Sequence, residues 1–413
     1  MSNKEERKAP VLRFKGFTDD WELHKLDEIV KFYGGLTYHP ENIQEDGTLV
    51  LRSSNIHNNQ IVLKDTVHVS PEIVNTSNVN VNDIIVVVRN GSRKLIGKHA
   101  RVLKAMPNTV IGAFMTGIKS QNGKFVNALF DGDIFQREIY KNLGATINQI
   151  TIKSFKEMEF YIPQNHEKQI IGNLISQIDN LLALQQRKTQ LLNKVIKYLT
   201  QNLFIQSDSL TPVLRFLSFN KKWTSTKIGK IMDVGSVKRI HQSDWRESGI
   251  PFYRARDIIA IRQNKELPSP IYISHEQYEN YSETSGKVNM NDLLVTGVGT
   301  IGVPLLVKKT PIYFKDGNII WLKNSNKLNG NFLFYVFQSS KIQDYINSIA
   351  GVGTVPTYTI DSAKKTPIVF PEKSEQTDIA NLLNTVTNMV HMSKSKKRVL
   401  MSIKNYLLQN MFI

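Results

Sequence analysis

The sequence contains no cysteine among its 413 residues. This absence excludes disulfide scaffolds, thiolate metal ligands and cysteine nucleophiles, and it is usual for proteins of the reducing cytosol. No stretch approaches the roughly 18 consecutive apolar residues of a membrane helix, and no apolar segment follows the charged residues 1–10. We therefore expect a cytoplasmic protein that makes no contact with a membrane.

Motifs for catalysis are also missing. No two prolines are adjacent, which excludes the tetrad of Asn or Asp, two prolines and an aromatic residue with which adenine methyltransferases grip a flipped base. Residues 91–98 resemble a phosphate loop, but five residues rather than four separate the glycines and no serine or threonine follows Lys98. Residues 297–302 match the dinucleotide fingerprint by letter, yet a strand pattern follows where a helix is needed. We expect no catalytic residues and no metal site in this chain.

Acidic residues are outnumbered by lysine and arginine, 36 to 53, which gives a net charge of +17. The excess is spread over the chain, because residues 1–206 carry +6 and residues 207–413 carry +11. Such a field attracts polyanions and speeds their encounter with the protein. Nucleic acid is the favoured partner, although a solvated basic surface without a ligand would give the same count.

The chain repeats itself once. Four segments of the first half recur in the second: 10–14 as 212–216, 81–86 as 290–295, 151–154 as 359–362, and 198–205 as 406–413. A period of about 205 residues indicates a duplicated unit rather than a solenoid. The stretches between these segments barely align. The two units therefore share a common frame, by which we mean the matched segments, and differ in the stretches between them.

Each unit combines an α+β domain with a long helix. Short β-rich runs broken by glycine, asparagine and proline predict globular domains over 1–163 and 207–371. An apolar period of 3.5 then predicts long helices over 164–206 and 372–413. The expected seam residues are Ile171, Ile175, Ile178, Leu182, Leu192, Ile196, Leu199, Leu203, Ile379, Leu383, Val386, Val390, Leu400, Leu407 and Met411. Pairing of the helices as an antiparallel coiled coil with internal pseudo-two-fold symmetry is expected; the alternative is one helix in each domain's own core.

Candidate DNA contacts are polar and basic side chains near the ends of predicted strands. They are Arg52, Ser53, Ser54, Asn55, Arg89, Asn90, Ser92, Arg93, Lys94, Lys98 and Arg101 in the first unit, and Lys238, Arg239, Arg254, Arg256, Arg262 and Thr300 in the second. Arginine can bind guanine through two hydrogen bonds, asparagine can bind adenine, and lysine and serine suit phosphates. Arg52 and Arg254 match between units, which favours phosphate positioning over base reading. For any one residue, a solvated charge or an ion pair is the alternative.

This organisation resembles the specificity subunit of type I restriction-modification enzymes over essentially the whole chain. The segments that carry the resemblance are 249–258 (Gly-Ile-Pro-Phe-Tyr-Arg-Ala-Arg-Asp-Ile), 288–294 with Gly299-Thr300-Ile301-Gly302, and Ile162-Pro163 and Phe370-Pro371 ahead of Glu167 and Glu375-Gln376. The first unit departs from the pattern, because residues 51–56 are a looser version of the motif around Arg254.

The resemblance implies that each domain reads one half of a bipartite site in double-stranded DNA. The helices would set the spacer and dock two modification subunits, to which restriction subunits are added. The chain itself would hold no cofactor and be non-catalytic; S-adenosylmethionine, ATP and Mg²⁺ would bind the partner subunits. The alternative is a stand-alone catalytic DNA methyltransferase or nuclease.

Overall fold

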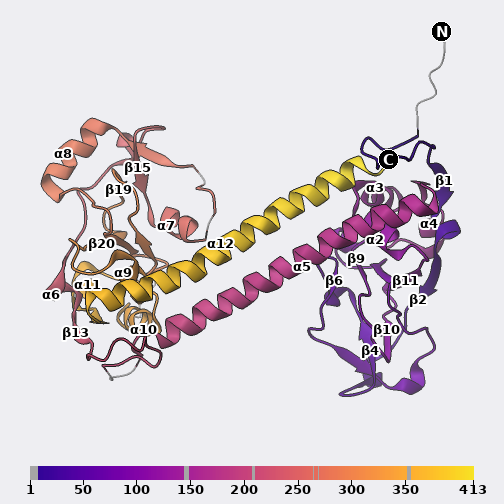
Figure 1. Cartoon of the computed structure of the whole chain (residues 1–413), viewed down its shortest axis with the longest axis horizontal. Coiled ribbons are helices and arrows are strands. Elements are labelled where there is room, and N and C mark those ends of the chain that lie inside the picture. Colours follow the sequence, from indigo (N-terminus) through magenta and orange to yellow (C-terminus); the bar gives the residue numbers. More distant parts are fainter. Residues whose placement is uncertain (1–7, 144–147, 207–209, 264, 268, 351–354) are drawn as a thin grey trace, which may run out of the picture. The chain divides into compact units, whose positions relative to one another are not determined.

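The structure is a computed structural model that describes residues 8–143, 148–206, 210–263, 265–267, 269–350 and 355–413. Most of the N-terminal segment 1–10 and the first residues of the predicted second domain lie outside this description. The chain divides into two compact units, a first unit of Met1–Gln186 with Lys394–Ile413 and a second unit of Arg187–Ser393. Each unit contains one α+β domain and half of each long helix (Figure 1).

The two long helices are α5 (Asn165–Asn202) and α12 (Lys373–Asn410), each of 38 residues. In the first unit Lys404 of α12 contacts Asp179 of α5, and Lys397 Nζ donates to Gln186 Oε1 at 2.8 Å. Later residues of α12 therefore face earlier residues of α5. The half-helices of the first unit are antiparallel, as expected.

The second unit has the same arrangement. Thr189 Oγ1 donates to Ser393 Oγ at 2.9 Å, and Leu203 shares a buried cluster with Ile379. All fifteen expected seam residues are buried or half-buried in the described structure. The helix ends also enter the domain cores: Ile171 belongs to the core of the first domain. Within each unit, the buried residues between the two helices therefore continue into the core of the α+β domain. The alternative expectation, a helix packed in each domain's own core, holds for these helix ends.

The first domain is built on three sheets, ordered β2-β11-β8-β9, β10-β4-β7-β3 and β1-β12, with a small β5-β6 hairpin. Its strands are β1 (Glu22–Lys25), β2 (Lys31–Gly34), β3 (Ile43–Gln44), β4 (Thr48–Leu51), β5 (Ile56–His57), β6 (Gln60–Ile61), β7 (Val67–Val69), β8 (Ile84–Val87), β9 (His99–Arg101), β10 (Thr109–Ile111), β11 (Met115–Lys119) and β12 (Glu159–Ile162). Its helices are α1 (Leu26–Ile29), α2 (Gly123–Asp131), α3 (Asp133–Asn142) and α4 (Ile152–Lys156). Strand β8 is fully buried, as its continuous apolar sequence predicts.

The second domain repeats this frame with sheets β14-β20-β17-β18, β16-β15-β19 and β13-β21. Its strands are β13 (Thr224–Lys227), β14 (Asp233–Gly235), β15 (Ile250–Tyr253), β16 (Ile271–Ile273), β17 (Leu293–Thr296), β18 (Pro304–Leu306), β19 (Tyr313–Phe314), β20 (Ile319–Lys323) and β21 (Pro367–Phe370). Its helices are α6 (Ile228–Ile231), α7 (Ala255–Arg262), α8 (His275–Ser285), α9 (Gly330–Val336), α10 (Ser340–Ile349) and α11 (Ile360–Lys365). The α+β class expected from the sequence is confirmed in both domains.

A matched ion pair holds each domain to the start of its own helix. The Arg13 guanidinium donates to both carboxylate oxygens of Glu167 in α5 at 2.8 Å, and Arg215 does the same to Glu375 in α12. Both glutamate side chains are 1% exposed. The arginine of each repeated Pro-Val-Leu-Arg-Phe segment therefore binds the start of the long helix in its own unit.

In the part of the chain that the structure describes, we find no helix that is both long and apolar enough to span a membrane.

Candidate nucleic-acid interface

Two groups of predicted DNA contacts come together in the first unit. Ser53 lies in a short 3-10 turn after β4, and its Oγ accepts a hydrogen bond from Asn90 Nδ2 at 3.1 Å. Its carbonyl oxygen accepts one from Lys98 Nζ at 3.4 Å. The turn after β4 and the loop after β8 thus form one surface. We call it the basic surface: Arg52, Ser53, Ser54, Arg89, Asn90, Ser92, Arg93, Lys94 and Lys98.

Among the described residues, no carboxylate forms an ion pair with the five cations of the basic surface, which are Arg52, Arg89, Arg93, Lys94 and Lys98. Arg52 donates instead to a backbone oxygen, the Asp65 carbonyl, at 2.6 Å. Partial burial lowers the pKa of Lys98, since desolvation penalises its charged form. A group of uncompensated cations beside exposed hydroxyl groups is suited to a phosphate backbone.

Asn55 is a correction to the sequence interpretation. Its side chain is fully buried, its Oδ1 accepts from the Arg52 amide at 3.0 Å, and its Nδ2 donates to the Lys64 carbonyl at 2.9 Å. In the second unit Asp257 caps the Arg254 amide in the same way, at 2.9 Å. This position shapes a turn common to both units, so Asn55 is not available to bind DNA.

Arg101 and Arg262 each bind side chains of their own unit. Arg101 donates to Asn82 Oδ1 at 2.7 Å and to Ser176 Oγ of α5 at 2.9 Å. The Arg262 guanidinium lies 4.6 Å from the Phe334 ring centre and donates to Gln338. Burial lowers the pKa of both arginines. Their contacts hold elements of their own units together, and their role as DNA contacts stays a prediction.

The remaining candidates of the second unit are less concentrated. Arg254 is committed to an ion pair with Asp257 at 2.7 Å and is 13% exposed, so it stabilises its turn. Arg239 is exposed but paired with Asp316 at 2.8 Å, a hydrogen bond that raises the pKa of the arginine. Lys238, Arg256 and Thr300 are exposed as well. These exposed side chains are the ones left available to a ligand.

The loop that follows β8 in the first domain corresponds to the loop that follows β17 in the second domain, but the two loops differ in charge. In the first domain the Asn90 amide donates to the Asn148 carbonyl at 3.2 Å; in the second, the Gly299 amide donates to the Pro356 carbonyl at 3.2 Å. The first loop is basic, whereas residues 297–302 are uncharged. Strand β18 begins at Pro304, so no helix follows the glycines and the dinucleotide interpretation is excluded.

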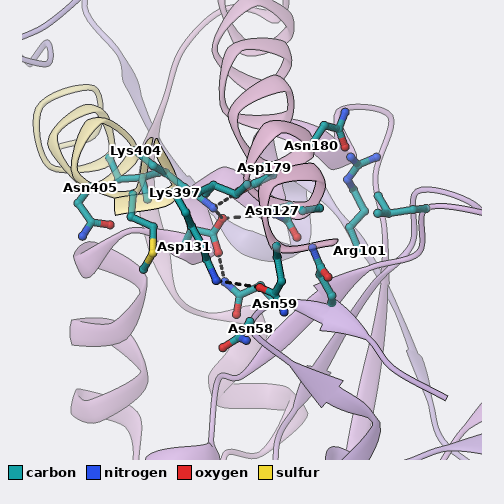
Figure 2. Close-up of a pocket in the computed structure, with 17 residues that line it drawn as sticks. Asn58, Asn59, Arg101, Asn127, Asp131, Asp179, Asn180, Lys397, Lys404 and Asn405 are labelled. Atoms are coloured by element: carbon teal, nitrogen blue, oxygen red, sulfur yellow. Dashed lines mark hydrogen bonds and ion pairs between the residues drawn. The ribbon is translucent and has the colours of Figure 1, made fainter. Parts of the chain in front are cut away.

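A polar hollow of about 340 Å³ lies within the first unit, lined by the domain and both half-helices (Figure 2). The Lys404 side chain points between two carboxylates, binding Asp131 Oδ2 at 2.7 Å and Asp179 Oδ1. Asp131 also meets His99 Nε2 at 3.1 Å. Burial raises the pKa of Asp179. Burial also penalises the charged form of Asp131, but the hydrogen bonds and positive charges of His99 and Lys404 lower the pKa of Asp131 below its usual range. The charges compensate one another and fix α12 to the domain.

No group of three or more metal-ligating side chains occurs among the described residues.

Each long helix carries a second apolar face that the sequence analysis missed. On α5, in the second unit, Leu191, Val195 and Tyr198 are 43–59% exposed. On α12, in the first unit, their equivalents Val399, Ile403 and Tyr406 are 44–59% exposed. Both sets have the spacing of a heptad seam and differ by 208 positions. We call these two sets of residues the outer faces. In the sequence they form a second 3.5-residue period of apolar residues, beside the period of the buried seam residues.

The model of the family described as "Type I restriction modification DNA specificity domain" matches residues 18–194 and 220–401. One match falls on each repeat, and together they span most of the chain. The chain belongs to this family. The two matched specificity domains each contain one α+β domain and most of one long helix.

Two specificity subunits similar to this chain match it over most of their length. The StySPI type I restriction enzyme specificity subunit of Salmonella potsdam is 24% identical over 386 residues, which is 87% of this chain and 81% of the relative. The MjaVIII specificity subunit of Methanocaldococcus jannaschii is 21% identical over 406 residues, 92% of this chain and 89% of the relative.

The fold of the two specificity domains is also that of a solved protein. The S subunit of a type I restriction-modification system from M. genitalium superposes with a TM-score of 0.65 at 16% identity, covering 98% of this chain and 99% of that one. This likeness confirms the architecture of two α+β domains with long helices.

Proposed function

We propose that the chain is the non-catalytic specificity subunit of a type I restriction-modification complex, in which each globular domain binds one half of a bipartite site in double-stranded DNA. The observation that carries this proposal is the basic surface of the first specificity domain, whose five cations form no ion pair with any carboxylate among the described residues; a second specificity domain of the same family follows it in the chain. Lysine and arginine there neutralise phosphates, while exposed Ser54 and Ser92 can reach base edges. The complex acts in the cytoplasm.

The outer faces are the docking sites for two modification subunits in this proposal. Exposed apolar residues at heptad spacing are suited to a partner helix, and their equivalence in both units fits two copies of one partner. Residues 180–206 and 379–413 contain no aspartate or glutamate, but four and five basic residues respectively. The partner helix should therefore flank its apolar seam with acidic residues. Restriction subunits join this core, and S-adenosylmethionine, ATP and Mg²⁺ bind these partners.

Lengthening both helices tests the proposal that they set the spacer. The variant duplicates seven residues after Gln186 in α5 and seven after Lys396 in α12, so the paired seam keeps its register. Seven helical residues add about 10 Å, so the spacer should grow by up to about three base pairs with both half-sites unchanged. Methylation mapping of DNA treated with the chain and its modification subunit gives the readout.

The same mapping contains its own controls. Lengthening one helix alone misaligns the seam and should abolish methylation rather than change the spacer. The purified chain without modification subunits should leave DNA unmethylated and uncut. A changed half-site would contradict the spacer role, and methylation or cleavage by the chain alone would contradict the non-catalytic role.

A further inference from the structure

An apolar hollow of about 470 Å³ adjoins the basic surface in the first unit. Its lining includes Leu36, Tyr38, Ile43 and Phe114, and Arg52 and Ser54 of the basic surface border it. Phe114 is 53% exposed and Ile43 is 47% exposed. Apolar side chains this large, left open to water beside cations, indicate a surface that meets a ligand with both anionic and apolar parts.

The backbone holds Phe114 firmly in place. The Phe114 carbonyl oxygen accepts hydrogen bonds from the amides of Val88 at 3.0 Å and Arg89 at 3.2 Å. The Arg89 guanidinium lies 5.1 Å from the centre of the Phe114 ring. The aromatic ring and the cations therefore belong to one preorganised surface.

A close approach of two glycines sets the wall of the hollow. The Leu36 amide donates to the Ile111 carbonyl at 2.7 Å, and a Cβ on Gly35 would lie 2.1 Å from the Gly112 carbonyl oxygen. Only glycine fits at position 35, and the residue 202 positions later is Val237. The place of Phe114 in the second domain is taken by Asn318, whose carbonyl accepts the Gly297 amide at 2.8 Å. The glycine and the aromatic ring that shape this hollow are thus replaced by Val237 and Asn318 at the matched positions of the second domain.

Duplex DNA offers one apolar group on the major-groove edges of its bases, the C5 methyl group of thymine. We propose that this hollow recognises thymine, an inference that rests on the proposed function. The hollow receives the C5 methyl group of a thymine in the half-site bound by the first domain, and Phe114 is the specificity-determining contact. Arg52, Arg89 and Lys98 bind the adjacent phosphates and bring that base edge to the ring.

The test compares thymine with uracil, which lacks only the methyl group. After the site is mapped, duplexes with one thymine at a time replaced by uracil are bound to the complex of the full chain and its modification subunit. At one position of this half-site binding should weaken about fourfold, the effect of losing one buried methyl group. 5-Bromouracil, whose bromine fills the place of the methyl, should restore it.

Two variants separate the thymine contact from general DNA affinity. Phe114→Ala should bind thymine and uracil duplexes equally at that position; the side chain is half exposed, so the domain keeps its core. Arg93→Ala, a change on the exposed basic surface, should weaken both duplexes alike and keep the fourfold ratio. Thymines in the other half-site serve as an internal control, because Phe114→Ala should not alter their ratios.

The outcomes distinguish this inference from the function on which it rests. If the complex binds no duplex selectively, the proposed function falls and the thymine contact with it. If binding is selective but the half-site contains no A·T pair, or Phe114→Ala retains the full thymine preference, only the thymine contact is overturned.

Discussion

Replacing Leu191 and Tyr198 by glutamate should remove one modification subunit from the complex, and the equivalent change at Val399 and Tyr406 should remove the other. These side chains are 49–59% exposed, so the substitutions leave the cores intact. A carboxylate buried in an apolar interface costs several kcal/mol, which corresponds to at least about 100-fold weaker binding. Native mass spectrometry should report one bound modification subunit for either double variant and none for the combined variant, which should not methylate DNA.

The matched control changes charge on the same helix but away from the outer face. Lys197→Glu, at an exposed position on another side of α5 from Leu191 and Tyr198, should weaken docking only slightly. Because the proposed partner helix is acidic, lysines at 191 and 198 should weaken docking less than glutamates do. Two bound modification subunits in the combined glutamate variant would contradict the docking assignment.

Arg13→Ala should lower the free energy of unfolding of the first unit by about 3–5 kcal/mol, the usual cost of leaving one buried charge unpaired. Glu167 is 1% exposed, and its hydrogen bond raises the pKa of Arg13. The same segment also reaches α12, since the Leu12 amide donates to the Asn410 carbonyl at 2.8 Å. Urea unfolding followed by circular dichroism measures the change.

The double variant Arg13→Met with Glu167→Leu separates the charge effect from lost packing. With no buried charge remaining, it should recover most of the stability that Arg13→Ala loses. Equal destabilisation of the single and double variants would show that the ion pair is not what holds the domain to α5.

The frame could be predicted from the sequence because its signals are periodic or repeated. The 3.5-residue period located α5 and α12, and the recurrence of residues 10–14 marked two units. The outer faces were harder to predict, because Leu191 and Tyr198 directly precede Leu192 and Leu199 of the buried seam in the sequence. One apolar period is enough to predict a helix, so the second period adds nothing to that prediction, and only the structure shows that its side chains are exposed.

Side-chain roles were less accessible, because they depend on partners far away in sequence. Asn55 and Arg101 have the composition of DNA contacts, yet one caps a turn and the other binds Ser176, 75 residues later. The hollow beside Phe114 requires Gly35 to meet Gly112, a contact that no local pattern announces. Residue type suggested the chemistry, but only the fold shows which charges remain unpaired.

The central claim is that each repeat reads its own half of the DNA site. Its most direct test exchanges residues 214–371 for the corresponding domain of another specificity subunit and maps methylation by the complex. One half-site should change to that of the donor, while the other half-site and the spacer remain. A change in both half-sites, or in neither, would contradict the claim.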